Sequence, residues 1–475
     1  MRPKVENPYL KLPPLCYDRV NPTPLKDPSL LHINHQVAKS LHLKEEFLKS
    51  SDFVAFANGD LLLDGSDNFA MCYAGHQFGF YVPRLGDGRA INIGTTNSLH
   101  LQLKGAGETL YSRQGDGRAV VRSSIREYLM SEAMHNLGIP TTRALSIILS
   151  PQRVFRENWE ETSMVLRVSP SWVRFGTIEY FSHRKRYQEL EEIIDYVIAE
   201  SYPHLIGEEN LYLRLFEEIV EKTAKLLALW QSVGFNHGVM NTDNMSIAGL
   251  SIDYGPYAFL DDYDTQFICN HTDRDGRYSF GNQPHIAQWN LQALMVAFAP
   301  LAPIMKMEKI LDTYQALYTK EFLRLMGEKI GISSIEAEDF ELIETMLEML
   351  QKLRIDYTLF FRTLSHYQEQ RDALLKLGFH HNDIHKWLDA YDKRVAKDSS
   401  SHTVRNQKML QTNPKYVLKN YMIQEAIEGV EQGDTTLFEA LFEIAREPYS
   451  EHLAYQRWAE ATPNRFKNQK LSCSS

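Results

Sequence analysis

Hydrophobic and polar residues alternate strictly between Leu99 and Lys104, which is the pattern of a β-strand with one buried face. The alternation assigns the leucines at positions 99, 101 and 103 to the buried face. His100, Gln102 and Lys104 fall on the opposite face. The sequence therefore predicts a strand that ends in a lysine on its polar side.

A helix is predicted to follow this strand. Apolar residues recur at helical spacing across 125–137, and Gly138-Ile139-Pro140 would end the helix. Ser124 and Glu127 have the spacing of a capping box, in which each side chain bonds the backbone N–H of the other residue. We therefore expect Ser124 to cap the start of this helix.

The remaining chain shows short predicted strands first and long predicted helices later. The expected elements are a short helix at 33–41, strands at 144–149 and 164–168, helices across 187–231, a loop at 267–284, helices from 285 onward with one or two at 334–364, a polar connector at 397–413 and two helices in 416–446. Taken together, the pattern predicts an α+β protein.

The order of these elements matches a two-lobed protein-kinase-like fold with a large helical C-terminal extension. On this interpretation residues 1–60 form an N-terminal extension and residues 61–185 the kinase-like N-lobe. Residues 186–300 form the kinase-like C-lobe with the catalytic and metal loops. Residues 301–475 form the helical extension with a cysteine-containing tail.

Two acid-bearing turns lie close together, Asn241-Thr242-Asp243-Asn244 and Asp253-Tyr254-Gly255, and the alternating segment 245–252 between them predicts a β-hairpin. Magnesium takes hard oxygen ligands from only one or two side chains. Asn244 and Asp253 fit that need, and Asp243 would remain to act on a substrate hydroxyl. Kinases use a similar Asp, Asn and Asp-Phe-Gly set, but their base Asp lies several residues before the Asn. A polar turn without chemistry is the alternative.

Composition restricts the classes of function. The 475 residues are 43% apolar and 24% charged, as in an ordinary soluble protein of two or three domains. A net charge of −10 argues against a nucleic-acid partner. The N-terminus has no signal-like segment, and the most apolar run, 291–305, contains two prolines, so we expect no membrane association. Four scattered cysteines make no metal spacing and fit a reducing cytoplasm.

Several basic residues are candidate phosphate ligands. Lys104 resembles the phosphate-binding lysine of a kinase N-lobe, and Glu127 could pair with it, with Glu132 as a second candidate. Arg167 lies within an apolar run and Arg174 follows it; guanidinium groups bind phosphate in a bidentate manner. For each, a solvated surface role is the alternative, and for Glu127 the capping box.

Two similar glycine turns flank the strand at 99–104. Gly86-Asp87-Gly88-Arg89 precedes the strand, and Gly115-Asp116-Gly117-Arg118 follows it. Glycines at such turns let backbone N–H groups approach phosphate oxygens closely. Asp-Gly is also a common hairpin turn, so each turn alone is a weak indication of nucleotide binding.

Long stretches of the sequence resemble the selenoprotein O family, the pseudokinase-like protein adenylyltransferases. The stretches are GDGRA from Gly86, LKGAGETLYSRQGDGRAVVRSSIREYLMSEAMHNLGIPTTRALS from Leu103, RVSPSWVRFGTIEYF from Arg167, NHGVMNTDNMSIAGLSIDYGPYAFLD from Asn236, DYTLFFRTLS from Asp356, NPKYVLKNYMIQEAI from Asn413 and the terminal Cys-Ser-Ser. They extend over nearly the whole chain. The chain therefore resembles the members of that family.

The resemblance implies a kinase-like fold that binds ATP in reversed orientation and transfers AMP to Ser, Thr or Tyr hydroxyls of proteins, with Mg²⁺ or Mn²⁺ as cofactor and UTP as a possible second donor. The implied catalytic base is Asp243, the metal ligands are Asn244 and Asp253, and the partner of the lysine is Glu127. The implied nucleotide contacts are Gly86, Gly88, Arg89, Lys104, Asp116, Gly117, Arg167, Arg174 and Asp253. A phosphotransferase of ordinary polarity and a non-catalytic nucleotide-binding scaffold are the competing functions.

The family is named for a selenocysteine near the C-terminus, where this chain has Cys473. Cys269 follows the acidic turns, at the place of a kinase activation segment. A transient, regulatory disulfide between the two is one expectation. Two unrelated thiols are the other, because the sequence does not show how far apart they lie.

Overall fold

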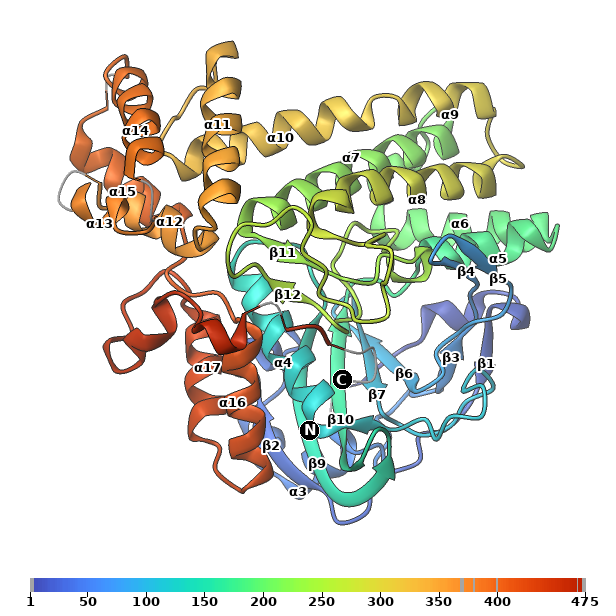
Figure 1. Cartoon of the computed structure of the whole chain (residues 1–475). Helices are drawn as coiled ribbons and strands as arrows, with labels where there is room; N and C mark the ends of the chain where they lie inside the picture. Colours follow the sequence, from blue (N-terminus) through green and yellow to red (C-terminus); the bar gives the residue numbers. More distant parts are fainter. Residues whose placement is uncertain (1–3, 368–370, 379–380, 399, 468, 472–475) are drawn as a thin grey trace.

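The computed structural model describes residues 4–367, 371–378, 381–398, 400–467 and 469–471, which form a mixed α/β protein (Figure 1). An antiparallel sheet lies beside a layer of long helices, and a further group of helices gathers at one end of α10. The layer comprises α5 (Phe175–His183), α6 (Tyr187–Ser201), α7 (Leu211–Val233), α8 (Gln283–Phe298), α9 (Ile304–Leu311) and α10 (Tyr314–Lys329). The helices predicted across 187–231 are confirmed by α6 and α7.

The sheet has the strand order β1-β3-β6-β7-β10-β9-β2, with β8 paired to β10, and its pairs are antiparallel. The strands are β1 (Tyr17–Arg19), β2 (Ser29–Ile33), β3 (Phe69–Met71), β6 (Ala90–Thr96), β7 (Leu99–Lys104), β8 (Ala119–Val120), β9 (Arg143–Phe155) and β10 (Trp159–Ser169). Both ends of this order, β1 and β2, come from the first sixty residues. The predicted strands at 144–149 and 164–168 lie within β9 and β10.

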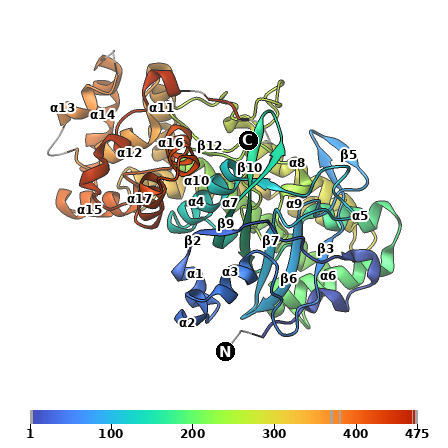
Figure 2. The same ribbon diagram turned by 90° about the horizontal axis from the view of Figure 1, so that it is seen from below.

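The predicted strand at 99–104 is confirmed by β7, and so are its two faces. Leu101 and Leu103 are buried in a core shared with α1 (His35–Ser40), α2 (Glu45–Leu48) and α3 (Ser51–Ala57), which cover one face of the sheet (Figure 2). The helix predicted at 33–41 corresponds to α1. Gln102 lies on the opposite face, where it is paired across the sheet with Arg167 of β10. The two-residue period of the strand thus places its leucines in the core and its polar side chains on the opposite face of the sheet.

The predicted capping box is wrong. Helix α4 runs from Val121 to Asn136, so Ser124 lies inside its first turn and Val120 is the N-cap. Ser124 accepts a hydrogen bond from Ser163 of β10 at 2.5 Å. Glu127 points to the sheet, where it binds Lys104 and Arg167. Both side chains that the local pattern assigned to a cap therefore make contacts with strands of the sheet.

The predicted hairpin at 245–252 is also wrong. Thr242–Asn244 forms a short 3₁₀ helix, and the segment after it makes isolated bridges to distant residues, Ser246 to Arg174 and Ser251 to Thr141. Strands β11 (Phe235–Asn236) and β12 (Ala258–Phe259) pair outside the segment. Burial along 245–252 does not alternate, because Ser246 and Ser251 are buried while Leu250 is only partly buried, so the apolar alternation does not mark the two faces of a hairpin.

The C-terminal part is helical. It contains α11 (Ala337–Leu353), α12 (Tyr357–Leu364), α13 (Arg371–Leu375), α14 (His381–Val395), α15 (His402–Thr412), α16 (Asn420–Glu431) and α17 (Thr436–Arg446). The polar connector predicted at 397–413 is wrong, because α15 begins there with Ser401 as N-cap and buries Arg405 and Met409. The two helices predicted in 416–446 are confirmed by α16 and α17, which pack against α4.

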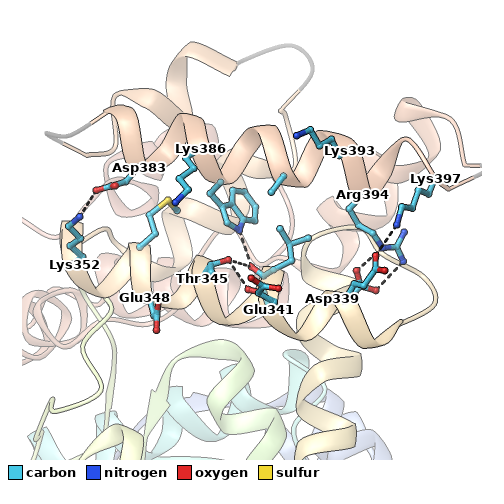
Figure 3. A pocket seen from close by; sticks show the side chains of 15 residues that line it. Asp339, Glu341, Thr345, Glu348, Lys352, Asp383, Lys386, Lys393, Arg394 and Lys397 are labelled. Carbon is cyan, nitrogen blue, oxygen red and sulfur yellow. Dashed lines mark hydrogen bonds and ion pairs between the residues drawn. The ribbon is translucent and has the colours of Figure 1, made fainter.

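A charged groove of about 580 Å³ lies between α11 and α14 (Figure 3). Ion pairs close it at both ends, Lys352 with Asp383 at 2.8 Å and Lys397 with Glu338 at 2.9 Å. Its floor includes Trp387, whose ring N–H donates to the carbonyl of Leu342 at 3.0 Å. These contacts hold the two helices together. Among the helices of the described residues, none has the length and apolar character that a membrane span requires.

Candidate active site

A cavity of about 570 Å³ lies between the polar face of the sheet and the acidic turns. It is lined by Gly86, Gly88, Arg89, Lys104, Asp116, Gly117, Arg167, Arg174, Asp243, Asn244 and Asp253. Every nucleotide, catalytic and metal residue expected from the sequence therefore faces one space. Glu127 lies behind Lys104 and is not part of the lining.

Lys104 at the end of β7 forms an ion pair with Glu127 of α4. Arg167 of β10 approaches the same carboxylate, at 3.0 Å from Nη1 to Oε1. Burial acts to raise the pKa of Glu127, but Lys104 and Arg167 outweigh it and the net pKa is lowered. Burial lowers the pKa of Lys104, with Glu127 opposing that shift. The glutamate is thus an anion held between two cations.

Asp253 receives two guanidinium groups. Arg167 Nη1 donates to Oδ1 at 2.7 Å, and Arg174 Nη1 donates to Oδ2. Burial alone would raise the pKa of Asp253, but Arg174 and Arg167 hold it well below its usual value. Its backbone has φ 57°, in the left-handed region that Asp tolerates better than most residues. Both arginines are almost fully buried, whereas the Asp253 side chain is 23% exposed to the cavity.

Asp243 is the carboxylate with the fewest partners in the cavity. Gln77 Nε2 donates to its Oδ2 at 3.2 Å, while Oδ1 is buried and has no hydrogen-bond partner among the described residues. Burial raises the pKa of Asp243 to about 6, opposed by Arg174 and Gln77. Arg174 also donates to the backbone carbonyl of Asp243 at 2.7 Å. The carboxylate is therefore ionised at neutral pH and one of its oxygens lacks a donor.

Asn244 follows Asp243 in the same 3₁₀ turn. Its amide Nδ2 donates to the carbonyl of Val239 at 3.0 Å. That bond fixes the side chain through its nitrogen, so the amide oxygen is the end left to act as a ligand.

The two glycine turns require glycine for packing reasons. Gly86 has φ 140°, and a Cβ there would lie 2.3 Å from the ring of Tyr111. Gly117 has φ 66°, and its Cβ would lie 2.0 Å from the backbone of Gly107. The carboxylate of Asp116 is bound in a bidentate manner by Arg156, at 2.7 Å to each oxygen. Residues of both turns line the cavity.

Three residues that contact the site were not among its candidate residues in the sequence. Asp87 is buried and accepts from the backbone N–H of Met71 at 3.1 Å and from Gln102 Nε2 at 3.3 Å. Gln102 in turn accepts from Arg167 Nη2 through its own oxygen. Gln77 comes from the hairpin of β4 (Gly75–Gln77) and β5 (Phe80–Val82). The polar face of β7 indicated Gln102, but no pattern distinguished Gln77.

Cys269 is buried outside the cavity, and Cys473 lies outside the described residues. The backbone N–H of Leu471 donates to the carbonyl of Cys269 at 2.8 Å, and that of His271 donates to the carbonyl of Leu471 at 3.0 Å. The described end of the tail therefore runs alongside Cys269. The redox pairing of Cys269 with Cys473 stays a prediction.

Comparison with known proteins gives this arrangement a family. Residues 2–446 match the family described as protein adenylyltransferase SelO. Similar proteins named protein nucleotidyltransferase YdiU occur in Myxococcus xanthus, 44% identical with 99% of each chain covered, and in Thioalkalivibrio sulfidiphilus, 43% identical with 99% of each covered. A third, from Aliivibrio fischeri, is 42% identical with 98% of each covered. This chain belongs to the SelO family of protein adenylyltransferases.

Proposed function

We propose that this chain transfers AMP from ATP to Ser, Thr or Tyr hydroxyls of proteins and releases pyrophosphate. The observation that carries the proposal is that one cavity combines several cations with a carboxylate that has few partners. Lys104, Arg167 and Arg174 line the cavity, and so does Asp243, whose Oδ2 has a single side-chain donor, Gln77. Catalysis of phosphate-group transfer depends on such positioning and charge neutralisation.

We assign the triphosphate to the cations of the cavity. Arg167 and Arg174 are buried, so their interaction with phosphate oxygens is stronger than it would be in water. Lys104 and Arg89 would add charge, and the backbone of Gly86, Gly88, Asp116 and Gly117 would approach the phosphates closely. In the reversed orientation that the family resemblance implies, the γ-phosphate is buried and the α-phosphate faces Asp243.

A divalent cation fits the oxygen donors beside Asp243. Within the described residues no three His, Cys, Asp or Glu side chains cluster as metal ligands. That suits Mg²⁺ or Mn²⁺, which takes one or two protein oxygens and completes its shell with water and phosphate. Asp253 and Asn244 would hold the ion. When bound, it would neutralise charge on the phosphates of the leaving group.

The chain's own contribution to the reaction is a proton transfer at Asp243. The acceptor oxygen forms a bond to the α-phosphorus, and the bond from that phosphorus to the bridging oxygen breaks. The hydroxyl proton goes to the Asp243 carboxylate, and pyrophosphate takes the electrons of the broken bond. With a pKa of about 6, the carboxylate is ionised at neutral pH and still basic enough to help.

We further propose that the fold is protein-kinase-like, with the N-lobe at 61–185 and the C-lobe at 186–300, preceded by the extension 1–60 and followed by the helical extension 301–475. Three features support the proposal: Lys104 on a sheet strand, its pairing with Glu127 of α4, and an Asp-Tyr-Gly turn at 253. These correspond in kind to the lysine, helix glutamate and Asp-Phe-Gly of kinases.

Labelled nucleotides test the function. We would incubate the purified chain with Mg²⁺ or Mn²⁺ and ATP labelled at either the α- or the γ-phosphate, and then measure label on protein. Label from the α-position only is expected. Label from the γ-position only would assign an ordinary phosphotransferase, and label from neither would leave a nucleotide-binding scaffold. Repeating the experiment with α-labelled UTP measures the preference for the donor.

A further inference from the structure

Strand β4 lies directly against the turn that carries Asp243, although the two are more than 160 residues apart in the chain. The backbone N–H of His76 donates to Thr242 Oγ1 at 2.7 Å, and the N–H of Phe78 donates to Asn241 Oδ1 at 3.2 Å. These bonds flank Gln77 on both sides. The position of Gln77 relative to Asp243 is therefore fixed by backbone contacts.

The alternation of the strand gives β4 two different roles on its two faces. Gly75 and Gln77 are two residues apart and share the face toward Asp243. A Cβ at Gly75 would lie 2.7 Å from Asp243 Oδ1, so the missing side chain allows the close approach. His76 faces the other way, where its ring nitrogen lies 3.2 Å from the buried carboxylate of Glu179. Glu179 also accepts from Thr242 Oγ1 at 3.0 Å, which ties the same turn from behind.

The two oxygens of Asp243 are thereby made different. A carboxylate only accepts hydrogen bonds, so the amide nitrogen of Gln77 is the end that can bind it. Oδ2 has that donor at 3.2 Å, while Oδ1 is buried and has none among the described residues. Because Oδ1 has no exposed surface and lies against Gly75, Oδ2 is the oxygen that an acceptor hydroxyl in the cavity could approach.

We propose that Gln77 is a positioning residue for Asp243: its amide binds Oδ2, fixes the rotation of the carboxylate and so holds Oδ2 in place to receive the proton of the acceptor hydroxyl. Gln77 does not react itself. This inference rests on the proposed function, because it assigns the oxygen that the transfer uses. It predicts that loss of the Gln77 amide slows the transfer without affecting the binding of ATP.

Two variants of similar size test the proposal. Gln77→Met keeps the length of the side chain and removes the donor. Gln77→Glu keeps the shape and turns a carboxylate toward Asp243. The matched control is Gln424→Met on α16, because Gln424 also donates to a carboxylate, that of Glu428 at 3.0 Å, but at an exposed site outside the cavity lining. All are measured with α-labelled ATP and a protein that takes label from the wild-type chain, the chain itself included.

For Gln77→Met we expect kcat to fall about 10- to 100-fold, the loss typical of a hydrogen bond to a charged group, with KM for ATP and Tm unchanged. The kcat of Gln77→Glu should be lower still, and the kcat of Gln424→Met should equal that of the wild type. An active wild-type chain with unchanged kcat in Gln77→Met refutes the role of Gln77 alone. If Gln77→Met lowers kcat, ATP affinity and Tm together, Gln77 stabilises the structure in general, and that result also refutes the proposal. A wild-type chain that transfers no label refutes the proposed function and this role with it.

Discussion

Replacing Asp253 with Asn should both destabilise the chain and abolish transfer. Asp253 lies between Arg167, at 2.7 Å from its Oδ1, and Arg174, which binds its Oδ2. After the change Arg167 keeps Glu127 at 3.0 Å, but the nearest carboxylate to Arg174 is Asp87 at 3.9 Å. Removing one partner from a buried ion pair costs about 3–5 kcal/mol, and the remaining contacts favour the lower end, about 3 kcal/mol.

This cost translates into a measurable melting shift. For a chain of 475 residues that unfolds cooperatively, the unfolding entropy is about 1 kcal/mol per degree, so Tm should fall by about 3 °C. Scanning calorimetry without nucleotide measures it. The control is Asp67→Asn, since Asp67 pairs with Arg19 at 2.7 Å but on the surface and should cost under about 1 kcal/mol. An Asp253→Asn variant with wild-type Tm and wild-type transfer would show that the assigned charge network is wrong.

Three further predictions concern other residues. Asp243→Asn should lower the rate of transfer while leaving ATP affinity near that of the wild type, and normal turnover would remove Asp243 as the base. Alanine at Lys104, Arg167 or Arg174 should each weaken ATP binding or transfer by roughly 1.5–3 kcal/mol, measured by equilibrium titration and label transfer, and three normal variants would remove them from the pocket. Lys329→Met should stabilise the chain at pH 7 by about 2–4 kcal/mol, because burial lowers the pKa of Lys329 to about 7. In the unfolded chain this lysine keeps its proton up to about pH 10.5, so the free energy of unfolding of the wild type should rise relative to that of the variant between pH 7 and 10. Denaturant titrations measure both free energies. A difference between them that stays constant with pH would contradict the assignment.

Features set by local periodicity were predictable from the sequence. The strand at 99–104 follows from strict alternation, and its buried leucines and polar face follow from the same period. The helices of 187–231 and the pair in 416–446 followed from apolar spacing. In these elements the local preference and the tertiary environment agree, so a short stretch of sequence is enough to predict the secondary structure and the buried face.

Features set by distant partners were not predictable in the same way. Ser124 and Glu127 fit a cap locally, but the helix starts at Val121 and the sheet recruits both side chains. Segment 245–252 alternates in sequence, but it forms bridges to Arg174 and Thr141 and does not pair with itself. Gln77 belongs to no motif, and its role depends on β4 reaching a turn far along the chain. A single sequence does not encode such pairings in any local pattern.

The charge arrangement around Asp253 also predicts that cation and nucleotide bind together. The same carboxylate that would hold a cation is bound by Arg167 and Arg174, so a bound cation would compete with both guanidinium groups for its negative charge. A buried guanidinium whose anion is shared with a cation is costly unless phosphate supplies further negative charge. Mn²⁺ should therefore bind at least about 10-fold more tightly with an ATP analogue whose α–β bridge cannot be cleaved, and by linkage the analogue should gain equally from Mn²⁺. Calorimetric titration of Mn²⁺ with and without the analogue measures both, with Asp253→Asn as the control that should lose the coupling. Equal Mn²⁺ affinity in the two titrations would mean that the arginines and the cation do not share Asp253.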